Sequence, residues 1–362
     1  MKLRVTKQDL LNGIQTVQNV VSSRATLPIL SNILIETQSG GLRLVATDLD
    51  MGISCVIPVN IIEEGAITIS AKRFSDIIKE LPDAPIEITT KKNNQVDVDC
   101  EKIKFKIMGL PKDEFPKFPE FKDKEAIPLE QSTLKNLLET TSFAVSHEET
   151  RYILNGILLE IKDNIIKLVA TDGRRMALRE SKLTASTKKD IKVIIPIKAI
   201  QEIIRNLKDE GEVLMMLGAN QILFDINKTL IVSRLIEGEF PNYQQVIPKP
   251  AENKLMVNRE DFLAAIRRAN LLSTPDFQAI KFEVFKNKLV ISKSTPDVGE
   301  SREELDINYS GKELIVGFNP HYLIDVLKSL GEEEVNLELT DVDKPGVIRS
   351  EGYLYLVLPM RI

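Results

Sequence analysis

The chain has 362 residues, of which 43% are hydrophobic and 28% charged, and a formal net charge of −5. This composition is typical of a globular protein, and the length fits two or three domains. No apolar run is long enough to cross a bilayer. The acidic balance argues against a protein that holds nucleic acid mainly by bulk electrostatic attraction, although a local basic surface stays open.

Six segments carry apolar residues at the spacing of an amphipathic helix. In chain order they span residues 10–21, 74–81, 134–141, 200–207, 262–269 and 322–330. Thr6, Asn258 and Asn319 are suitable N-caps, and Pro196 and Pro320 suit a first helical turn. The sequence therefore predicts two helices in each third of the chain.

Short β-rich or alternating runs lie between the predicted helices. Examples span residues 33–35, 42–45, 86–89 and 103–107. The order helix, strands, helix, strands predicts an α+β fold, with helices on one side of antiparallel sheet. Because helix and strands occur twice in each third, each third is a candidate for an internal duplication, with two similar halves.

An internal repeat is the clearest pattern in the chain. Residues 32–36 with 45–48 match residues 155–160 with 169–172, and Glu114-Phe115-Pro116 matches Glu239-Phe240-Pro241. A third copy is more diverged. The period of about 125 residues is a whole domain. We therefore expect three tandem copies of one fold, the first repeat at 1–122, the second at 123–249 and the third at 250–362.

The two cysteines, Cys55 and Cys100, lie in strand-like surroundings of the first repeat. In a chain of this size we interpret them as buried free thiols rather than a disulfide. The N-terminal residues have scattered charges and lack the apolar core of a signal peptide. A cytoplasmic location is therefore expected.

Catalytic patterns are sparse. The two histidines, His147 and His321, are far apart, and no zinc, Walker A or dinucleotide-binding motif occurs. Asp48 and Asp172 recur at equivalent places, which suggests either acid–base or metal chemistry or a structural role at a turn. Recurrence in two copies favours the structural role. An enzyme or ligand-binding protein centred on Asp172 and Arg174 stays as the alternative hypothesis.

Four segments carry a family resemblance. They are residues 24–30 (Arg-Ala-Thr-Leu-Pro-Ile-Leu), 151–156 (Arg-Tyr-Ile-Leu-Asn-Gly), 169–175 (Val-Ala-Thr-Asp-Gly-Arg-Arg) and 358–362 (Leu-Pro-Met-Arg-Ile). In this order and spacing, the chain resembles the bacterial DNA polymerase III beta subunits, the sliding clamps, over its full length.

The resemblance implies three tandem DNA-clamp domains and a head-to-tail homodimer that closes into a ring, with helices inside and antiparallel sheets outside. It further implies a non-catalytic processivity subunit of the DNA polymerase III holoenzyme, without cofactor or metal. The implied partners are double-stranded DNA without sequence specificity, the replicative polymerase, a clamp loader and other proteins with a clamp-binding motif. No membrane partner is implied.

The resemblance also places sites, partly with the help of the predicted helices. The implied DNA-binding residues are Arg24, Arg151, Tyr152, Lys79, Lys198, Arg205 and Arg268. The implied dimer interface contains Lys72, Arg73, Phe105, Ile107, Leu271, Leu272, Glu300, Glu303 and Glu304. The implied pocket for a short peptide with apolar and aromatic anchors contains Leu154, Thr171, Gly173, Arg174, Met176, Pro241, Val246, Leu356, Val357, Pro359, Met360 and Arg361.

Four positions depart from the family pattern. Arg174 stands where many clamps have His, and Gln245 where many have Arg, so we expect a different peptide preference. Ile153 replaces a second aromatic residue, and Glu148 replaces a neutral polar residue. Both of these changes are expected to weaken contacts with DNA.

Overall fold

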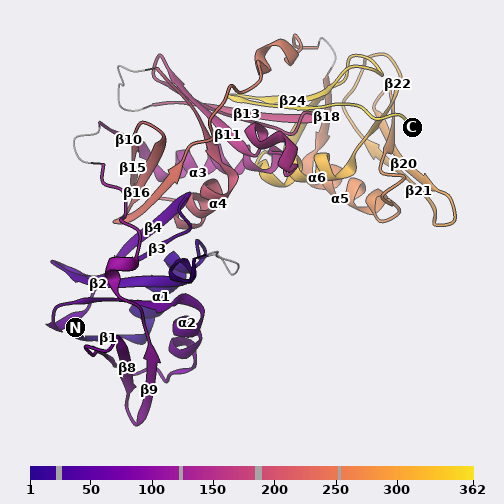
Figure 1. Cartoon of the computed structure of the whole chain (residues 1–362). Coiled ribbons are helices and arrows are strands. Elements are labelled where there is room, and N and C mark those ends of the chain that lie inside the picture. The colour runs from indigo at the N-terminus through magenta and orange to yellow at the C-terminus, as the bar shows by residue number, and fades with distance from the viewer. Residues whose placement is uncertain (22–26, 122–124, 184–189, 252–253) are drawn as a thin grey trace. The chain divides into compact units, whose positions relative to one another are not determined.

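The computed structural model describes residues 1–362 apart from 22–26, 122–124, 184–189 and 252–253. The described residues form two compact units (Figure 1). The first unit contains Met1–Ser132 and Lys198–Leu235, and the second contains Thr133–Ile197 and Ile236–Ile362. The division passes through the second repeat, so each unit joins part of that repeat to one terminal repeat.

One β-α-β-β-β motif recurs throughout the described residues, twice in each repeat. The first repeat contains β1 (Lys2–Val5), α1 (Lys7–Gln18), β2 (Asn32–Gln38), β3 (Gly41–Thr47) and β4 (Met51–Ile57), then β6 (Ala66–Ser70), α2 (Ala71–Glu80), β7 (Ile86–Thr90), β8 (Gln95–Cys100) and β9 (Ile103–Met108). An extra strand, β5 (Asn60–Glu63), lies between the two copies.

The second and third repeats follow the same order. The second contains β10 (Ala126–Glu130), α3 (Gln131–Glu139), β11 (Gly156–Lys162), β12 (Ile165–Thr171) and β13 (Arg175–Lys182), then β14 (Ile191–Pro196), α4 (Ile197–Asn206), β15 (Glu212–Leu217), β16 (Gln221–Ile226) and β17 (Thr229–Arg234). The third contains β18 (Lys254–Asn258), α5 (Arg259–Asn270), β19 (Ile280–Phe285), β20 (Lys288–Thr295) and β21 (Gly299–Asp306), then β22 (Leu314–Phe318), α6 (Pro320–Ser329), β23 (Glu334–Glu338), β24 (Gly346–Ser350) and β25 (Tyr353–Val357). Short 3₁₀ helices are η1 (Pro28–Ser31), η2 (Lys112–Glu114), η3 (Ser142–Ala144), η4 (Glu149–Leu154) and η5 (Tyr243–Val246).

The two motifs of each repeat exchange their first strands. In the first repeat β1 pairs with β7 of the other motif, and β6 pairs with β2. The same exchange pairs β10 with β15, β14 with β11, β18 with β23 and β22 with β19. The recurrence of the motif confirms the prediction that each repeat consists of two similar halves. The exchanged strands join these halves through backbone hydrogen bonds.

Neighbouring repeats share sheets. Strand β17 of the second repeat pairs antiparallel with β4 of the first, which produces the sheet β10-β15-β16-β17-β4-β3-β2-β6. Likewise β25 of the third repeat pairs with β13 of the second, which produces the sheet β14-β11-β12-β13-β25-β24-β23-β18. At both junctions, the last strand of the second motif of one repeat pairs with the last strand of the first motif of the repeat before it.

The predicted helix caps are largely confirmed. The Thr6 hydroxyl accepts from the Asp9 amide at 3.1 Å, the Asn258 side chain accepts from the Glu260 and Asp261 amides, and Asn319 caps α6 ahead of Pro320. These side chains satisfy amides that the first helical turn leaves unpaired. Pro196 is different, because it ends strand β14 and helix α4 begins one residue later.

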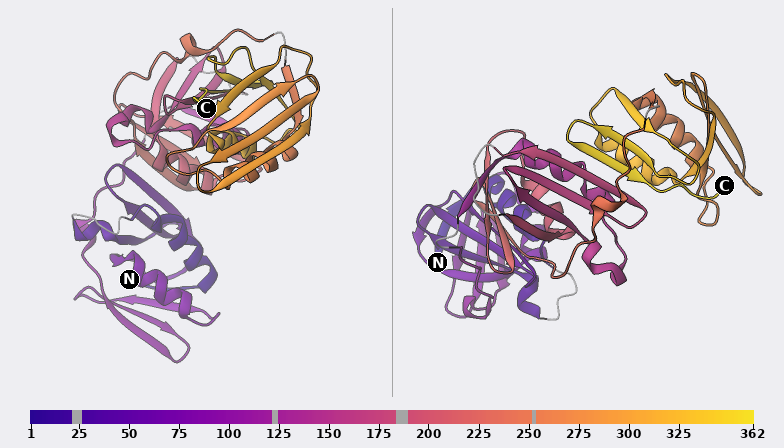
Figure 2. Two further views of the ribbon diagram at one scale, coloured as in Figure 1. Left: turned by 90° about the vertical axis from the view of Figure 1, so that its right-hand side faces the viewer. Right: turned by 90° about the horizontal axis from the view of Figure 1, so that it is seen from above.

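The packing follows the predicted faces. Helix α1 buries Leu10, Ile14 and Val17 together with Gly13, where a Cβ would lie 2.8 Å from a methyl carbon of Ile57. Leu11 is only partly buried. In the second unit, α5 contacts β18 of one sheet and β19, β20 and β21 of the other, and it lies beside α6 (Figure 2). The helix pair therefore fills the space between two sheets.

The repeated Glu-Phe-Pro motif covers the other face of the shared sheets. Phe115 packs with Ile29, Leu30 and Val45 in the first unit. Phe240 occupies the corresponding place in the second unit, within a larger apolar cluster. The repetition of this short motif therefore reflects the same packing task in two copies of the fold.

Both cysteines are buried free thiols, as expected. Burial raises the pKa of Cys55 to about 12, so its thiol stays protonated near neutral pH. None of the helices in the described parts of the chain is long and apolar enough to cross a membrane.

Candidate functional site

An apolar cluster on one face of the second unit brings together three predicted pocket residues. Leu154, Met176 and Leu356 are at most 9% exposed, and they pack with Phe240 and Tyr243. Leu356 reaches this cluster because β25 pairs directly with β13, where Met176 lies opposite Leu356. Side chains alternate along a strand, so Val357 points to the other face and is fully buried there. It can offer a ligand on the cluster face only its backbone.

The turn from Thr171 to Arg175 borders this cluster. Asp172 Oδ1 accepts hydrogen bonds from the amides of Arg174 and Arg175, at 2.8 and 3.0 Å. Gly173 has φ +86°, a conformation that side chains rarely adopt, and a Cβ there would lie 2.9 Å from Arg151 Nη1. Thr171 Oγ1 closes the turn by donating to the Arg175 carbonyl oxygen at 2.6 Å.

The equivalent turn of the first repeat has the same construction. Asp48 Oδ1 accepts from the amides of Asp50 and Met51, at 3.1 and 2.8 Å. Two aspartates at equivalent places thus perform one structural task, which confirms the structural interpretation of Asp48 and Asp172. Within the described residues, no group of three or more His, Cys, Asp or Glu side chains is placed to hold a metal ion.

The C-terminal residues extend along this turn. The Leu358 amide donates to the Arg174 carbonyl oxygen at 2.9 Å, and the Met360 amide donates to the Gly317 carbonyl oxygen at 2.8 Å. Leu358, Met360 and Ile362 are 41%, 36% and 68% exposed. The tail is therefore fixed by its backbone while it presents apolar side chains.

The other predicted pocket residues are more accessible than the cluster. Val246 is 55% exposed. Exposed residues also include Gly173, Arg174, Pro241 and Arg361, while Thr171 and Pro359 are partly buried. The predicted pocket residues thus include both buried apolar side chains and exposed aliphatic and cationic groups, a composition that suits a peptide with apolar anchors.

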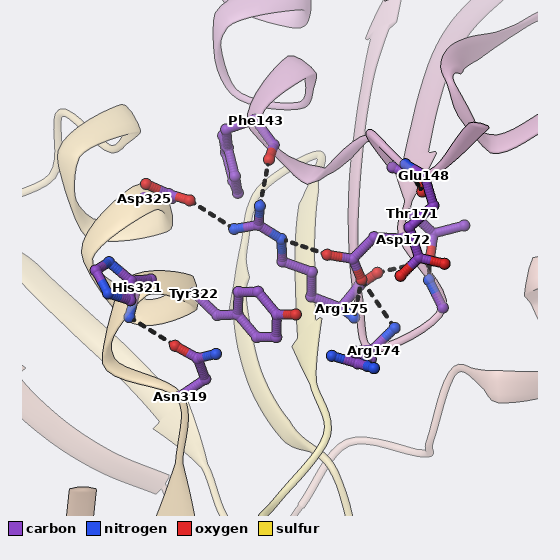
Figure 3. A network of polar contacts seen from close by, with 12 residues as sticks. Phe143, Glu148, Thr171, Asp172, Arg174, Arg175, Asn319, His321, Tyr322 and Asp325 are labelled. Carbon is purple, nitrogen blue, oxygen red and sulfur yellow. Dashed lines mark hydrogen bonds and ion pairs between the residues drawn. The ribbon is translucent and has the colours of Figure 1, made fainter. Parts of the chain in front are cut away.

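Sequence reasoning missed the most connected residue near this turn, Arg175. It is 8% exposed, and its guanidinium donates to Asp172 Oδ2 (3.0 Å), Asp325 Oδ2 (2.7 Å) and the Phe143 carbonyl oxygen (2.6 Å) (Figure 3). It also lies 4.4 Å from the ring centroid of Tyr322. The sequence shows two adjacent arginines after Gly173, which could have pointed to Arg175. It does not reveal which of these two arginines is buried.

Comparison with known proteins decides the family. Family models match residues 1–119 (DNA polymerase III beta subunit, N-terminal domain), 128–242 (central domain) and 244–361 (C-terminal domain). The chain belongs to the DNA polymerase III beta subunit family. Relatives named beta sliding clamp occur in Chlamydia pneumoniae (34% identity, 100% of this chain and 99% of the relative) and Escherichia coli K12 (34% identity, all of both chains).

Solved structures agree with this assignment. The sliding clamp from Bacillus subtilis has a TM-score of 0.96 at 33% identity, over 100% of this chain and 99% of the other. The DNA polymerase III beta subunit from Pseudomonas aeruginosa has a TM-score of 0.93 at 32% identity over all of both chains. The fold is therefore three tandem clamp domains, and the function is that of a DNA sliding clamp. The alternative centred on Asp172 and Arg174 is not supported.

The structure describes two of the three residues Arg24, Arg151 and Tyr152, which are expected to meet DNA. Arg24 lies outside the described residues. Tyr152 is 58% exposed. Arg151 donates through Nη1 to the Asp172 carbonyl oxygen at 2.9 Å, and its Nε lies 3.2 Å from Glu148 Oε2. Glu148, which stands where related clamps often have a neutral polar residue, thus forms an ion pair with Arg151, a predicted DNA-binding residue.

Most of the helix cations assigned to DNA have carboxylate partners. Lys198 pairs with Asp48 and Arg205 pairs with Glu202. Arg268 Nε donates to Glu303 Oε2 at 2.8 Å, and these contacts raise the pKa of Arg268. Lys79 is exposed on α2. These side chains are accessible, but for three of the four a phosphate would compete with an existing ion pair.

The residues assigned to the dimer interface lie in both units of the sliding clamp. In the first unit, Lys72 and Arg73 are exposed on α2, Phe105 is 37% exposed on β9 and Ile107 is partly buried. In the second unit, Leu271 is 81% exposed at the end of α5, and Leu272 is partly buried. Of the three glutamates on β21, Glu303 pairs with Arg268, and Glu304 pairs with Arg302 and Lys288.

Proposed function

We propose that two copies of this chain close head to tail into a ring around duplex DNA. The observation that carries the proposal is a pattern of strand pairing. At each junction between repeats, the last strand of a second motif pairs with the last strand of the preceding repeat's first motif, as β17 does with β4 and β25 with β13. Among the strands that end a motif in the described chain, β9 and β21 are the two that lie at a sheet edge without such a partner.

These two edges are equivalent to the strands that pair at the internal junctions. Strand β9 ends the second motif of the first repeat, and β21 ends the first motif of the third repeat. Pairing β9 of one copy with β21 of another would repeat the junction a third time. Such a heterologous contact must close into a ring or continue as a filament, and two copies of three repeats give a six-domain ring.

The chemistry of the two edges is complementary. Strand β9 presents exposed Lys104 and Lys106, whereas β21 presents exposed Glu300 and Glu304. Opposite charges on paired strands favour the correct register, and an open edge of this length would otherwise invite unspecific pairing.

Apolar and polar groups beside these edges support the same interface. Phe105 on β9 and Leu271 beyond α5 are large exposed apolar side chains. Asn270 Oδ1, Ser273 Oγ and Ser301 Oγ are buried, and none of them has a hydrogen-bond partner among the described residues. Groups of this kind usually find partners in the native assembly, so their clustering around α5 and β21 is consistent with a contact surface.

A ring holds its duplex by enclosing it, so few phosphate contacts are needed. Each added phosphate contact would strengthen binding and make it more dependent on salt. The acidic net charge and the paired cations Lys198, Arg205 and Arg268 fit weak, mobile contacts. Arg24, Arg151, Tyr152 and Lys79 would supply sequence-independent contacts.

The cluster around Leu154, Met176 and Leu356 would receive a short peptide with Leu and Phe anchors from the replicative polymerase, the clamp loader and other partners. Structures of sliding clamps from Pseudomonas aeruginosa and Bartonella birtlesii are described as bound to griselimycin. The high similarity in fold supports the proposal that this chain also binds griselimycin.

In this proposal the chain is a non-catalytic subunit of the DNA polymerase III holoenzyme and acts in the cytoplasm. Its domains span 1–122, 123–249 and 250–362. The strand pairs exchanged within each repeat support these boundaries, because each exchange falls inside one of the three ranges.

The decisive experiment compares closed and open DNA. Labelled protein is loaded by a clamp loader onto a nicked circular plasmid, and retention is followed by gel filtration before and after one restriction cut. The expected result is stable retention on the circle and rapid loss from the linear product. Equal retention on both would contradict the ring, as would a monomer at micromolar concentration.

A further inference from the structure

The Arg175 guanidinium links two segments that are far apart in the chain. Through Asp172 it reaches the turn that borders the proposed peptide site, and through Asp325 it reaches helix α6 of the third repeat (Figure 3). The Phe143 carbonyl oxygen and the Tyr322 ring complete its surroundings. Burial by itself lowers the pKa of Arg175, but the hydrogen bond to Asp325 and the neighbouring charges raise it, so the group stays charged.

The carboxylate of Asp172 has two separate tasks. Its Oδ1 atom holds the amides of Arg174 and Arg175, while its Oδ2 atom accepts from Arg175 Nε. A guanidinium is planar and rigid, so its position fixes the plane of the carboxylate that it contacts. Whatever holds the guanidinium therefore also holds the backbone of the turn at Gly173 and Arg174.

The first repeat provides an internal comparison. There, Asp48 Oδ1 holds the equivalent turn, and its Oδ2 atom contacts Lys198 on α4. Helices α4 and α6 are equivalent, since each belongs to the second motif of its repeat. Each turn is thus tied to the second helix of the following repeat, in one case by a lysine from that helix and in the other by Arg175 reaching toward Asp325.

We propose that Arg175 is a positioning residue that couples peptide docking to helix α6. The ion pair with Asp325 holds the Thr171–Arg174 turn in its binding conformation. A peptide bound at this turn in return stabilises α6. This inference rests on the proposed peptide site. It adds that peptide docking depends on helix α6, whose Asp325 carboxylate is not among the residues assigned to that site.

Asp325→Asn is the informative variant, because it removes the charge without changing the size of the side chain. The Asp325 side chain is 37% exposed, so the variant is expected to fold. Asp261→Asn is the matched control: it removes an exposed carboxylate from α5, in the same repeat. Asp325→Glu is the conservative variant that keeps a carboxylate for Arg175.

The first readout is fluorescence polarisation with a fluorescein-labelled peptide that carries Leu and Phe anchors. Coupling between two sites commonly changes affinity by about fivefold or more. We expect the Asp325→Asn protein to bind the peptide about fivefold more weakly. The Asp261→Asn protein should bind like the wild type, and Asp325→Glu should recover part of the loss.

The second readout separates coupling from a merely structural role. Because coupling is reciprocal, saturating peptide should slow hydrogen exchange of the α6 amides in the wild type. In Asp325→Asn, saturating peptide should still protect the Thr171–Arg175 turn but no longer protect α6. Thermal unfolding of all proteins checks that the comparison is made between folded states.

The outcomes distinguish this inference from the proposed function. If the peptide fails to bind the wild type, the peptide site itself is wrong. If the wild type binds but Asp325→Asn binds equally well, or keeps the protection of α6, then the coupling is wrong and the peptide site stands. An equal loss in Asp261→Asn would also overturn the coupling.

Discussion

The backbone amide of Leu358 donates a hydrogen bond to the carbonyl oxygen of Arg174 at 2.9 Å. This bond attaches the C-terminal tail to the turn that Asp172 holds, and the tail continues to a second backbone contact between Met360 and Gly317. One side of the proposed peptide site is therefore built from the last residues of the chain.

Removing Met360 to Ile362 should abolish peptide docking and spare dimerisation. The truncation deletes the contact with Gly317 and two exposed apolar side chains, but it leaves β9 and β21 intact. Fluorescence polarisation with the labelled peptide measures docking, and light scattering after gel filtration measures the dimer. Unchanged peptide affinity after the truncation would refute the assignment of the tail to the pocket.

Glu148→Gln should strengthen the contact with DNA. In the wild type, Glu148 lies 3.2 Å from Arg151 Nε and would also repel phosphates. Loss of this charge removes the carboxylate partner of Arg151 Nε, so we expect about one additional phosphate contact and a correspondingly steeper dependence of affinity on salt.

The test is a titration of a short duplex at several salt concentrations. Glu149→Gln is the matched control, since Glu149 is the adjacent exposed glutamate. The proposal for Arg151 is wrong if both variants change affinity equally, or if Glu148→Gln has no effect at low salt.

Leu271→Ala should weaken the dimer without destabilising the monomer. The side chain is 81% exposed in the single chain, so its removal costs little there. If the partner copy buries it, each interface should lose roughly 1 kcal/mol or more. Sedimentation equilibrium provides the dissociation constant, with Ile62→Ala as a control because Ile62 is 48% exposed on β5. An unchanged constant for Leu271→Ala would exclude Leu271 from the interface.

Lys293 provides a pH-dependent prediction. Its Nζ atom donates to the carbonyl oxygens of Phe277 and Ala279, at 2.6 and 2.9 Å, and burial lowers its pKa below the ordinary value of 10.5. The unfolded chain therefore binds this proton more tightly than the folded chain. As pH rises through the folded pKa toward 10.5, Lys293 should contribute increasingly to stability.

Urea unfolding of the wild type and Lys293→Met between pH 7 and pH 10.5 tests this expectation. The difference in unfolding free energy should move in favour of the wild type across the alkaline part of that range. A difference that is flat, or that moves toward the variant, would contradict the lowered pKa.

Local sequence signals predicted much of the fold. The helix faces and the caps Thr6, Asn258 and Asn319 follow from interactions within a few residues, so they can be identified without knowledge of the rest of the chain. The repeated aspartates Asp48 and Asp172 were also interpretable, since a turn cap contacts amides two and three residues ahead.

The candidate site was predicted less completely. Leu356 and Val357 are adjacent in sequence, and only the register between β25 and β13 shows that Leu356 faces the cluster while Val357 faces the helices. Similarly, Arg174 and Arg175 are indistinguishable in the sequence. Arg174 is exposed, whereas Arg175 is buried because Asp325, 150 positions away, supplies its partner.

The sequence by itself determined the threefold repeat, the helices and the family, because periodicity, caps and motifs are properties of short segments. The tertiary structure alone decided which strands stay at the sheet edges, which cations already have carboxylate partners, and which arginine joins the turn to α6. Strand pairing and ion pairs join residues that are distant in the chain, and their energies depend on burial and geometry that no short segment specifies.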